Sequence, residues 1–180
     1  AVRSPAQVRR LHACRKEPET IEWLQTTIKP GDTVYDIGAN VGAYTLIAAS
    51  IGGAETTVYA FEPSASTFDG LCQNVRLNNL SQQVIPFQVA LSDRTGVLQF
   101  EYSSTEPGAA LHKLHYETDG ANPHLDHIIG YRLDDFIDQM GLKLPTLIKM
   151  DVDGGELHIL RGGARTIHQA QLRSVLVEVE

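Results

Sequence analysis

Short apolar runs separated by polar and glycine-containing segments recur along the whole chain. The runs at 33–37 and 57–61 are rich in Val, Ile, Tyr and Phe, and the run at 146–150 contains Leu, Ile and Met, which is typical of buried strands. Longer segments place apolar residues at helical spacing, as Leu157 and Leu160 show. In chain order the pattern predicts helix 19–28, strand 33–37, helix 41–50, strand 57–61, helix 64–78, strand 84–91, strand 97–102, helix 132–140, strand 146–150, helix 155–170 and strand 175–179.

Strands that alternate with helices predict an α/β fold, with a mostly parallel sheet and helices on both of its faces. Ligands of such sheets bind beyond the carboxyl ends of the strands, where the strand order reverses. The residues that directly follow strands are therefore the candidates for chemistry. They are 36–42, 62–63, 90–93 and 151–156.

The length of 180 residues suits one domain. We expect an N-terminal helical segment at 1–29 and the main domain at 30–180. Segment 103–130 contains several glycines and prolines, so it is predicted to be an irregular, lid-like loop over the site.

Composition narrows the classes of function. Five basic groups and no acid lie in residues 1–16, and the remaining 164 residues carry ten basic and 22 acidic groups, a net charge of −12. A body with this net negative charge repels phosphate backbones, which disfavours nucleic acid as a general partner. No apolar run reaches the ~18 residues of a membrane span, and no secretion signal opens the sequence. Two cysteines, Cys14 and Cys72, form no disulfide framework, and we expect a cytoplasmic protein.

A glycine-containing turn and a distant acid predict a nucleotide site. Gly38 and Gly42 follow the first strand and allow the backbone to approach a ligand closely. Glu62 ends the second strand, where an acid can accept hydrogen bonds from two ribose hydroxyls. The alternative is that the glycines only form a tight turn and that Glu62 is a surface acid.

The glycine pattern disfavours a dinucleotide. Aligned on Gly38, the second and third glycines of G-x-G-x-x-G fall on Asn40 and Ala43, so an NAD-dependent oxidoreductase is not supported. The acid before the loop, Asp36, suits a ligand with a cationic amino group rather than a diphosphate. S-adenosylmethionine has an ammonium group, a carboxylate and a ribose but no phosphate, so it fits.

Four segments carry a family resemblance: DIGANVG at 36–42, FEP at 61–63, ALSD at 90–93, and KMDVDGGEL with LRG at 149–162. Together they resemble the FkbM family of S-adenosylmethionine-dependent methyltransferases. The resemblance implies the class I methyltransferase fold and activity on hydroxyl groups of natural products or sugars. It implies cofactor contacts for eight residues. Asp36, Gly38, Asn40 and Gly42 would line the methionine part, Glu62 would hold the ribose hydroxyls, and Pro63, Ala90 and Leu91 would lie against the adenine.

Two features depart from the family pattern. Asp153 and Gly155 replace a commoner Glu and a bulkier residue. The family fold also continues into an antiparallel hairpin, whereas this sequence stops at Glu180, as a fragment of a longer protein would. The apolar strand 175–179 would then be an exposed edge, and a homodimer could cover it.

Catalysis of methyl transfer to a hydroxyl needs an aligned acceptor and a group that takes its proton. Asp151, at the end of the fourth strand, is the first candidate, and Lys149 lies on the same strand face. Glu156 opens the next helix and could bind the acceptor. The alternatives are a structural ion pair for Lys149 and Asp151 and a helix cap for Glu156.

A metal is a further alternative that we do not favour. Asp151 and Asp153 could hold a Mg²⁺ ion, but two carboxylates are few for such a site. Four histidines of the long loop are expected to lie on the surface, with a metal cluster or a single catalytic base among them as the alternatives; they are His112, His115, His124 and His127. His158 and His168 are expected on exposed helix faces.

The sequence therefore predicts an S-adenosylmethionine-dependent O-methyltransferase that acts on a small molecule or a sugar. An RNA methyltransferase, supported only by basic segment 1–16, is one alternative. A non-catalytic cofactor-binding module is another. The absence of an Asn-Pro-Pro-aromatic motif after the fourth strand argues against methylation of amino groups on DNA bases.

Overall fold

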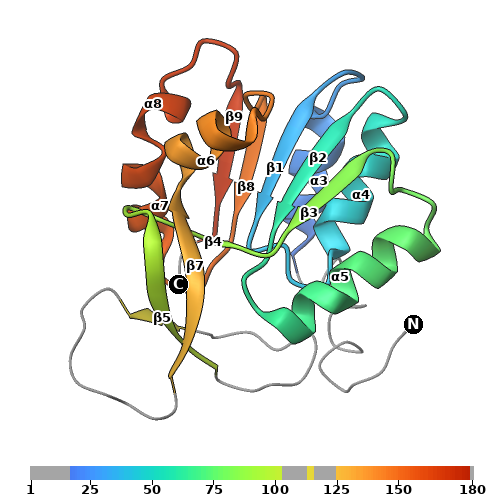
Figure 1. The fold of residues 1–180 in the computed structure, drawn as a ribbon. Coiled ribbons are helices and arrows are strands. Elements are labelled where there is room, and N and C mark those ends of the chain that lie inside the picture. The colour runs from blue at the N-terminus through green and yellow to red at the C-terminus, as the bar shows by residue number, and fades with distance from the viewer. Residues whose placement is uncertain (1–16, 103–112, 116–124, 179–180) are drawn as a thin grey trace.

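A parallel sheet forms the centre of the protein in the computed structural model, which describes residues 17–102, 113–115 and 125–178 (Figure 1). Within these ranges the sheet has five strands, all parallel. From one edge to the other they are β3 (Val84–Phe87), β2 (Thr57–Phe61), β1 (Thr33–Ile37), β8 (Leu147–Met150) and β9 (Ser174–Val177). The strand order reverses between β1 and β8, so a ligand is expected at their carboxyl ends.

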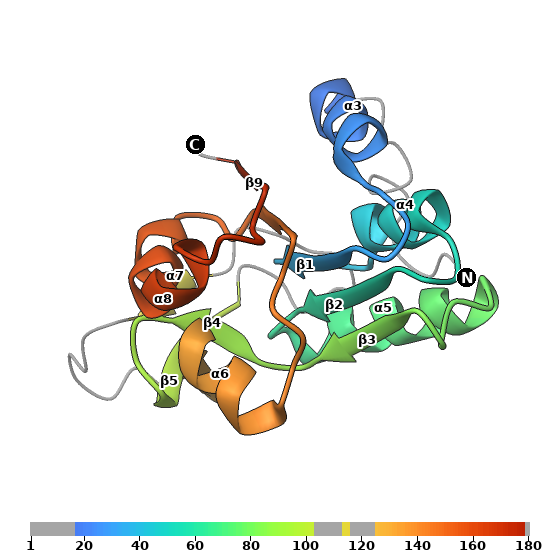
Figure 2. The same ribbon diagram turned by 90° about the horizontal axis from the view of Figure 1, so that it is seen from above.

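Helices cover both faces of this sheet, as Figure 2 shows. One face carries α3 (Pro18–Thr27), α4 (Ala43–Gly52) and α5 (Ala65–Leu77), and the other carries α6 (Leu133–Met140), α7 (Glu156–Gly162) and α8 (Ala164–Ile167). Successive side chains of β1 point to opposite faces of the sheet. Val34 packs with the α4 side, and Tyr35 and Ile37 pack with α6 and α7. The predicted α/β fold class is confirmed.

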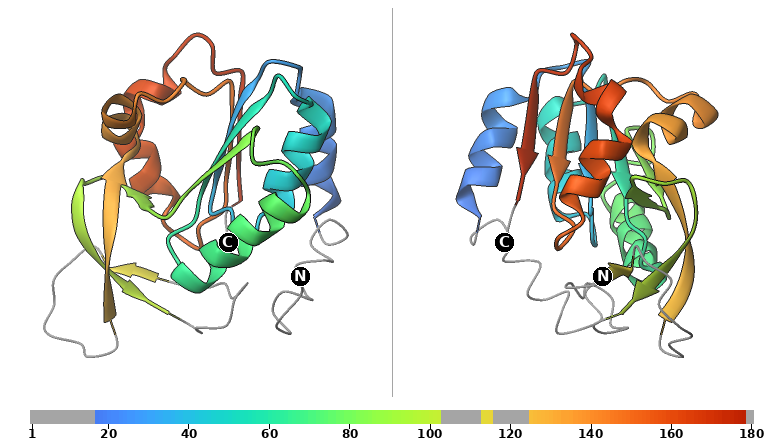
Figure 3. Two further views of the ribbon diagram at one scale, coloured as in Figure 1. Left: turned by 45° about the vertical axis from the view of Figure 1, so that its right-hand side comes forward. Right: turned by 90° about the vertical axis from the view of Figure 1, so that its left-hand side faces the viewer.

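A second sheet extends past the carboxyl ends of the main strands (Figures 1 and 3). In the described ranges its order is β4 (Ala90–Ser92), β7 (Leu125–Arg132), β5 (Gly96–Glu101) and β6 (Lys113–His115). The prediction that 103–130 is irregular is therefore wrong for β6 and for 125–130. The remaining parts of the predicted lid-like loop, 103–112 and 116–124, lie outside the described residues.

Two further predicted elements are interrupted. The strand expected at 84–91 divides into β3 and β4, which belong to different sheets; Pro86 is tolerated because β3 is an edge strand. The helix expected at 155–170 ends after Gly162. A Cβ on Gly162 would lie 1.9 Å from the carbonyl oxygen of Ser92, so α7 packs there with its backbone directly against β4.

The edge strand β9 pairs with β8 alone within the described part of the chain, and its four residues are half-buried. Helix α3 lies beside it, and the indole Nε1 of Trp23 donates a hydrogen bond to Ser174 Oγ at 2.9 Å. A homodimer through this edge stays a prediction. Within the described ranges, no helix is long and apolar enough to cross a membrane.

Candidate active site

The loops that follow β1, β2 and β8 are joined by backbone hydrogen bonds at one edge of the sheet. Gly38 N and Ala39 N both donate to Phe61 O at 3.0 Å, and Asp151 N donates to Ile37 O at 3.0 Å. The parallel register explains this meeting point, because Asp36 lies beside Ala60 on one side and Lys149 on the other. The candidate residues from three distant segments are thereby brought together.

Gly38 is required by both its conformation and its surroundings. Its φ is +79°, and a Cβ there would lie 1.8 Å from the carbonyl oxygen of Asp151. We expect the substitution Gly38→Ala to lower the melting temperature strongly, because backbone atoms of the β8 loop would have to move. Gly31→Ala is the matched control: its φ is +84°, but nothing lies within 4 Å of the added Cβ. It carries the conformational cost without the clash, so equal melting temperatures for the two variants would contradict this reasoning.

The carboxylate of Glu62 is buried and held in a fixed direction. Asn40 N donates to Oε2 at 2.9 Å, and Ser64 N donates to Oε1 at 2.8 Å. Asn40 adopts a left-handed conformation, with φ 51°, which turns its N–H towards Glu62. The loop after β1 and the start of α5 therefore orient one acid between them. The alternative reading of Glu62 as a surface acid is wrong.

Asp36 is buried on the α4 side of the sheet. Its Oδ2 accepts a hydrogen bond from Thr45 Oγ1, and its Oδ1 has no hydrogen-bond partner in the described structure. Burial raises the pKa of Asp36 above its ordinary value, and the positive charge of Lys149 opposes that rise. An unpartnered buried carboxylate oxygen is costly, so a donor brought by a ligand would be favoured there.

Lys149 and Asp151 form a close ion pair. The ammonium Nζ of Lys149 lies 3.1 Å from Asp151 Oδ2; the lysine side chain is 3% exposed and the aspartate side chain 29%. The carboxylate thus lies between a buried cation and solvent. It is placed to meet a substrate, whereas the lysine is placed to support it.

The carboxylate of Glu156 accepts hydrogen bonds from backbone groups of its own loop. Oε1 receives Val152 N at 3.3 Å and Gly154 N at 3.2 Å. Asp153 and Gly154 both have positive φ, so this carboxylate stabilises a tight turn. Both donors precede α7, so these hydrogen bonds stabilise the turn before the helix and are not a helix cap. A catalytic role of Glu156 stays a prediction.

The remaining residues predicted to contact the cofactor lie at the start of α4, directly after Glu62 and in β4. Gly42 has φ +88° and directly precedes α4, and Pro63 directly follows Glu62. Ala90 and Leu91 lie in β4, beyond the end of β3 at Phe87; both are buried, and Leu91 packs in the core. Their contact with adenine stays a prediction.

The histidines of the described residues form no metal site with their neighbours. No group of three His, Cys, Asp or Glu residues there could hold a metal ion. His127 lies exposed in β7 and His115 lies in β6, whereas His112 and His124 fall outside the described ranges. His158 is not simply surface-exposed. Its Nδ1 lies 2.8 Å from Asp93 Oδ2, and this contact lowers the pKa of Asp93.

Sequence reasoning missed the role of Tyr44. Its ring lies over the Lys149 ammonium, with 5.0 Å between Nζ and the ring centroid. The two residues are far apart in sequence, and an aromatic residue at the start of a helix carries no signal of such a contact. The Asp93–His158 pair was missed for the same reason.

Comparison with solved structures identifies the class of fold. Methyltransferase FkbM from Methylobacillus flagellatus KT matches with a TM-score of 0.59 at 18% identity, over 97% of this chain and 44% of the other. A precorrin-6y C5,15-methyltransferase from Geobacter metallireducens GS-15 matches with a TM-score of 0.52 at 12% identity, over 91% and 61%. The fold is that of the class I methyltransferases.

The family follows from the sequence comparisons. The model of the methyltransferase FkbM domain matches residues 36–180, so the chain belongs to the FkbM methyltransferase family. It is 29% identical to the hexuronic acid methyltransferase AglP of Haloferax volcanii, over 99% of this chain and 68% of that protein. It is also 29% identical to the 31-O-demethyl-FK506 methyltransferase FkbM of Streptomyces tacrolimicus, over 84% and 66%. The chain thus spans about two thirds of the length of these curated relatives.

Proposed function

We propose that this protein is an S-adenosylmethionine-dependent O-methyltransferase that acts on a hydroxyl group of a sugar or another small molecule. The observation that carries the proposal is the buried Glu62 carboxylate, oriented by Asn40 N and Ser64 N at the carboxyl edge of the sheet. It suits the two hydroxyls of a ribose. Membership of the FkbM family supports the same reaction class.

The residues present fit this cofactor. Glu62 would hold the ribose, and the unpartnered Oδ1 of Asp36 would meet the cationic amino group. Gly38, where a Cβ would meet the carbonyl oxygen of Asp151, lets the loops after β1 and β8 lie close together at this edge. Two buried acids at this edge suit a ligand with a positive charge and no phosphate.

The chain's own part in the reaction is to place and deprotonate the acceptor. When bound, S-adenosylmethionine supplies a methyl group already activated by the positive charge on sulfur. Asp151, partly exposed directly after β8, would accept the hydrogen bond of the acceptor hydroxyl, fix its direction and take its proton. Lys149, buried behind it, would keep a positive charge next to the oxygen as its proton leaves.

The acceptor class rests on the relatives. One of them is named a hexuronic acid methyltransferase and another a methyltransferase of 31-O-demethyl-FK506, so a hydroxyl of a sugar or natural product is the acceptor we propose. The acidic body of the chain disfavours RNA, and basic segment 1–16 lies outside the described residues. A cytoplasmic location also stays a prediction.

Thermal unfolding with added ligands tests the cofactor. At a ligand concentration 100-fold above Kd, binding to the native state adds about 2.7 kcal/mol of stability. For a domain of this size we expect S-adenosylmethionine and S-adenosylhomocysteine to raise Tm by about 5–10 °C. NAD is expected to have no effect, and a rise with NAD alone would contradict the proposal.

A further inference from the structure

We propose that Tyr44 is a positioning residue of this active site: the face of its ring holds the buried Lys149 ammonium against Asp151. The proposal deepens the function proposed above and rests on it, because Asp151 is there the group that orients the acceptor. None of the family motifs considered in the sequence points to this contact.

The geometry begins with the placement of the ring. Tyr44 is the second residue of α4, directly after the loop that follows β1, and its side chain is 8% exposed. Strand β8 lies next to β1 in the sheet, so Lys149 reaches the same space from the neighbouring strand. The ammonium Nζ lies 5.0 Å from the ring centroid, within the range at which a cation is attracted to an aromatic face.

The charges around Lys149 explain why its position needs support. Asp151 Oδ2 lies 3.1 Å from Nζ, and Asp36 is the register partner of Lys149 on β1. The pKa of Asp36 responds to both burial and the charge of Lys149, so the two groups interact. A lysine ammonium is a mobile charge on a flexible stem. Asp36 on β1 and Asp151 directly after β8 offer it two partners, and the ring favours one fixed position.

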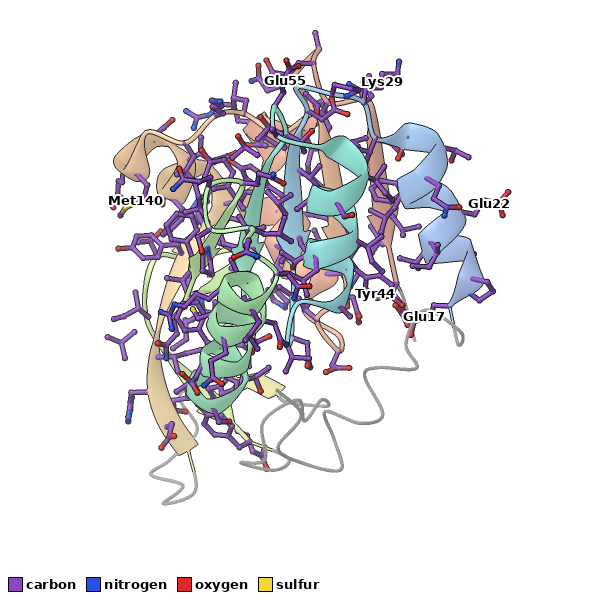
Figure 4. All side chains as sticks on the ribbon, turned by 90° about the vertical axis from the view of Figure 1, so that its right-hand side faces the viewer. Glu17, Glu22, Lys29, Tyr44, Glu55 and Met140 are labelled. Carbon is purple, nitrogen blue, oxygen red and sulfur yellow. The ribbon has the colours of Figure 1, made fainter. Side chains whose placement is uncertain are left out.

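The two ends of Tyr44 have separate contacts. Its hydroxyl donates a hydrogen bond to the carboxylate of Glu17, which directly precedes α3, and Figure 4 shows the two side chains together at one end of α3 and α4. The ring face contacts Lys149. The hydroxyl contact and the ring contact can therefore be removed independently.

This separation defines the variants. Tyr44→Phe removes the hydroxyl and keeps the aromatic face, whereas Tyr44→Leu removes both. Glu17→Gln weakens only the hydroxyl contact and is the matched control. Pentafluorophenylalanine at position 44 keeps the ring shape but withdraws charge from its face, so it tests the contact even if the leucine variant fails to fold.

The primary measurement is the ¹⁵N NMR signal of the Lys149 ammonium, assigned by its loss in Lys149→Met. A buried, fixed ammonium exchanges its protons slowly and gives a resolved signal. We expect the signal in the wild type, Tyr44→Phe and Glu17→Gln, and its loss to exchange in Tyr44→Leu and the pentafluorophenylalanine variant. An unchanged signal in both of the latter would overturn the proposal.

The second measurement separates positioning from cofactor binding. We expect Tyr44→Leu to lower kcat for methyl transfer to glucuronic acid by about 100-fold, as small displacements of reacting groups do. The Kd of S-adenosylhomocysteine should stay unchanged, and Tyr44→Phe should restore most of kcat. A rise in Kd that parallels the fall in kcat would assign Tyr44 to the scaffold. If S-adenosylmethionine does not bind the wild type, the proposed function fails, and the Lys149 signal still decides the role of the ring.

Discussion

Replacement of Glu62 by alanine is expected to weaken the binding of S-adenosylhomocysteine by about 100-fold or more. The substitution removes the charged acceptor of the ribose hydroxyls, and hydrogen bonds to charged groups contribute about 1.5–3 kcal/mol each. It also leaves Asn40 N and Ser64 N without their acceptor, which loosens the two loops that form the pocket edge. Isothermal titration calorimetry measures the change in Kd.

Two further variants make the result specific. Glu62→Gln keeps the size of the side chain but turns an amide NH₂ towards one of the two backbone donors, so it too should bind weakly. Glu55→Gln changes an exposed glutamate at the opposite end of the sheet (Figure 4) and should bind like the wild type. Wild-type affinity in both Glu62 variants would show that this acid does not hold the ribose.

The second large effect is expected at Asp151. We expect Asp151→Asn to lower kcat by about 100-fold while the Kd of S-adenosylhomocysteine stays the same. Asparagine keeps the shape of the side chain and can still accept a hydrogen bond from Lys149, but it loses the charge that directs and accepts the proton of the acceptor. Transfer of tritium from labelled S-adenosylmethionine to hydroxylated acceptors, glucuronic acid among them, measures kcat.

Asp153→Asn is the matched control for this experiment. Position 153 has φ 55°, a conformation that asparagine adopts readily, and it lies in the same loop. The control should keep its turnover if Asp151 acts on the acceptor. An equal loss of turnover in both variants would mean that the charge of the whole loop matters, and loss of cofactor affinity in Asp151→Asn would make it a structural residue.

Much of the fold was predictable because the main sheet is buried on both faces. Strands β1, β2 and β8 appear in the sequence as short apolar runs at nearly their observed bounds. Two interruptions were not predictable: the division of the predicted strand 84–91 and the end of the predicted helix 155–170 after Gly162. They depend on contacts between distant segments. The helix after Asp151 ends where Gly162 meets the backbone of Ser92, a contact that its own periodicity cannot reveal.

The candidate site, too, was predictable only in part. That Asp36, Gly38 and Glu62 lie close together could be predicted, because Asp36 is near the end of β1 and the other two directly follow β1 and β2. The role of Glu156 could not be decided from sequence, because both a substrate contact and a cap are compatible with a glutamate at the start of a helix. Its hydrogen bonds from Val152 N and Gly154 N show instead that it stabilises the turn before the helix.

The close packing of α7 on β4 has a mechanical consequence. Gly162 contacts Ser92, His158 pairs with Asp93, and Glu156 at the other end of the helix holds the turn that follows Asp151. Helix α7 therefore connects the second sheet to the turn that follows Asp151. Exchanging the second sheet for that of another family member would shift Asp151 unless α7 were transplanted with it, so the two should be inherited and engineered together.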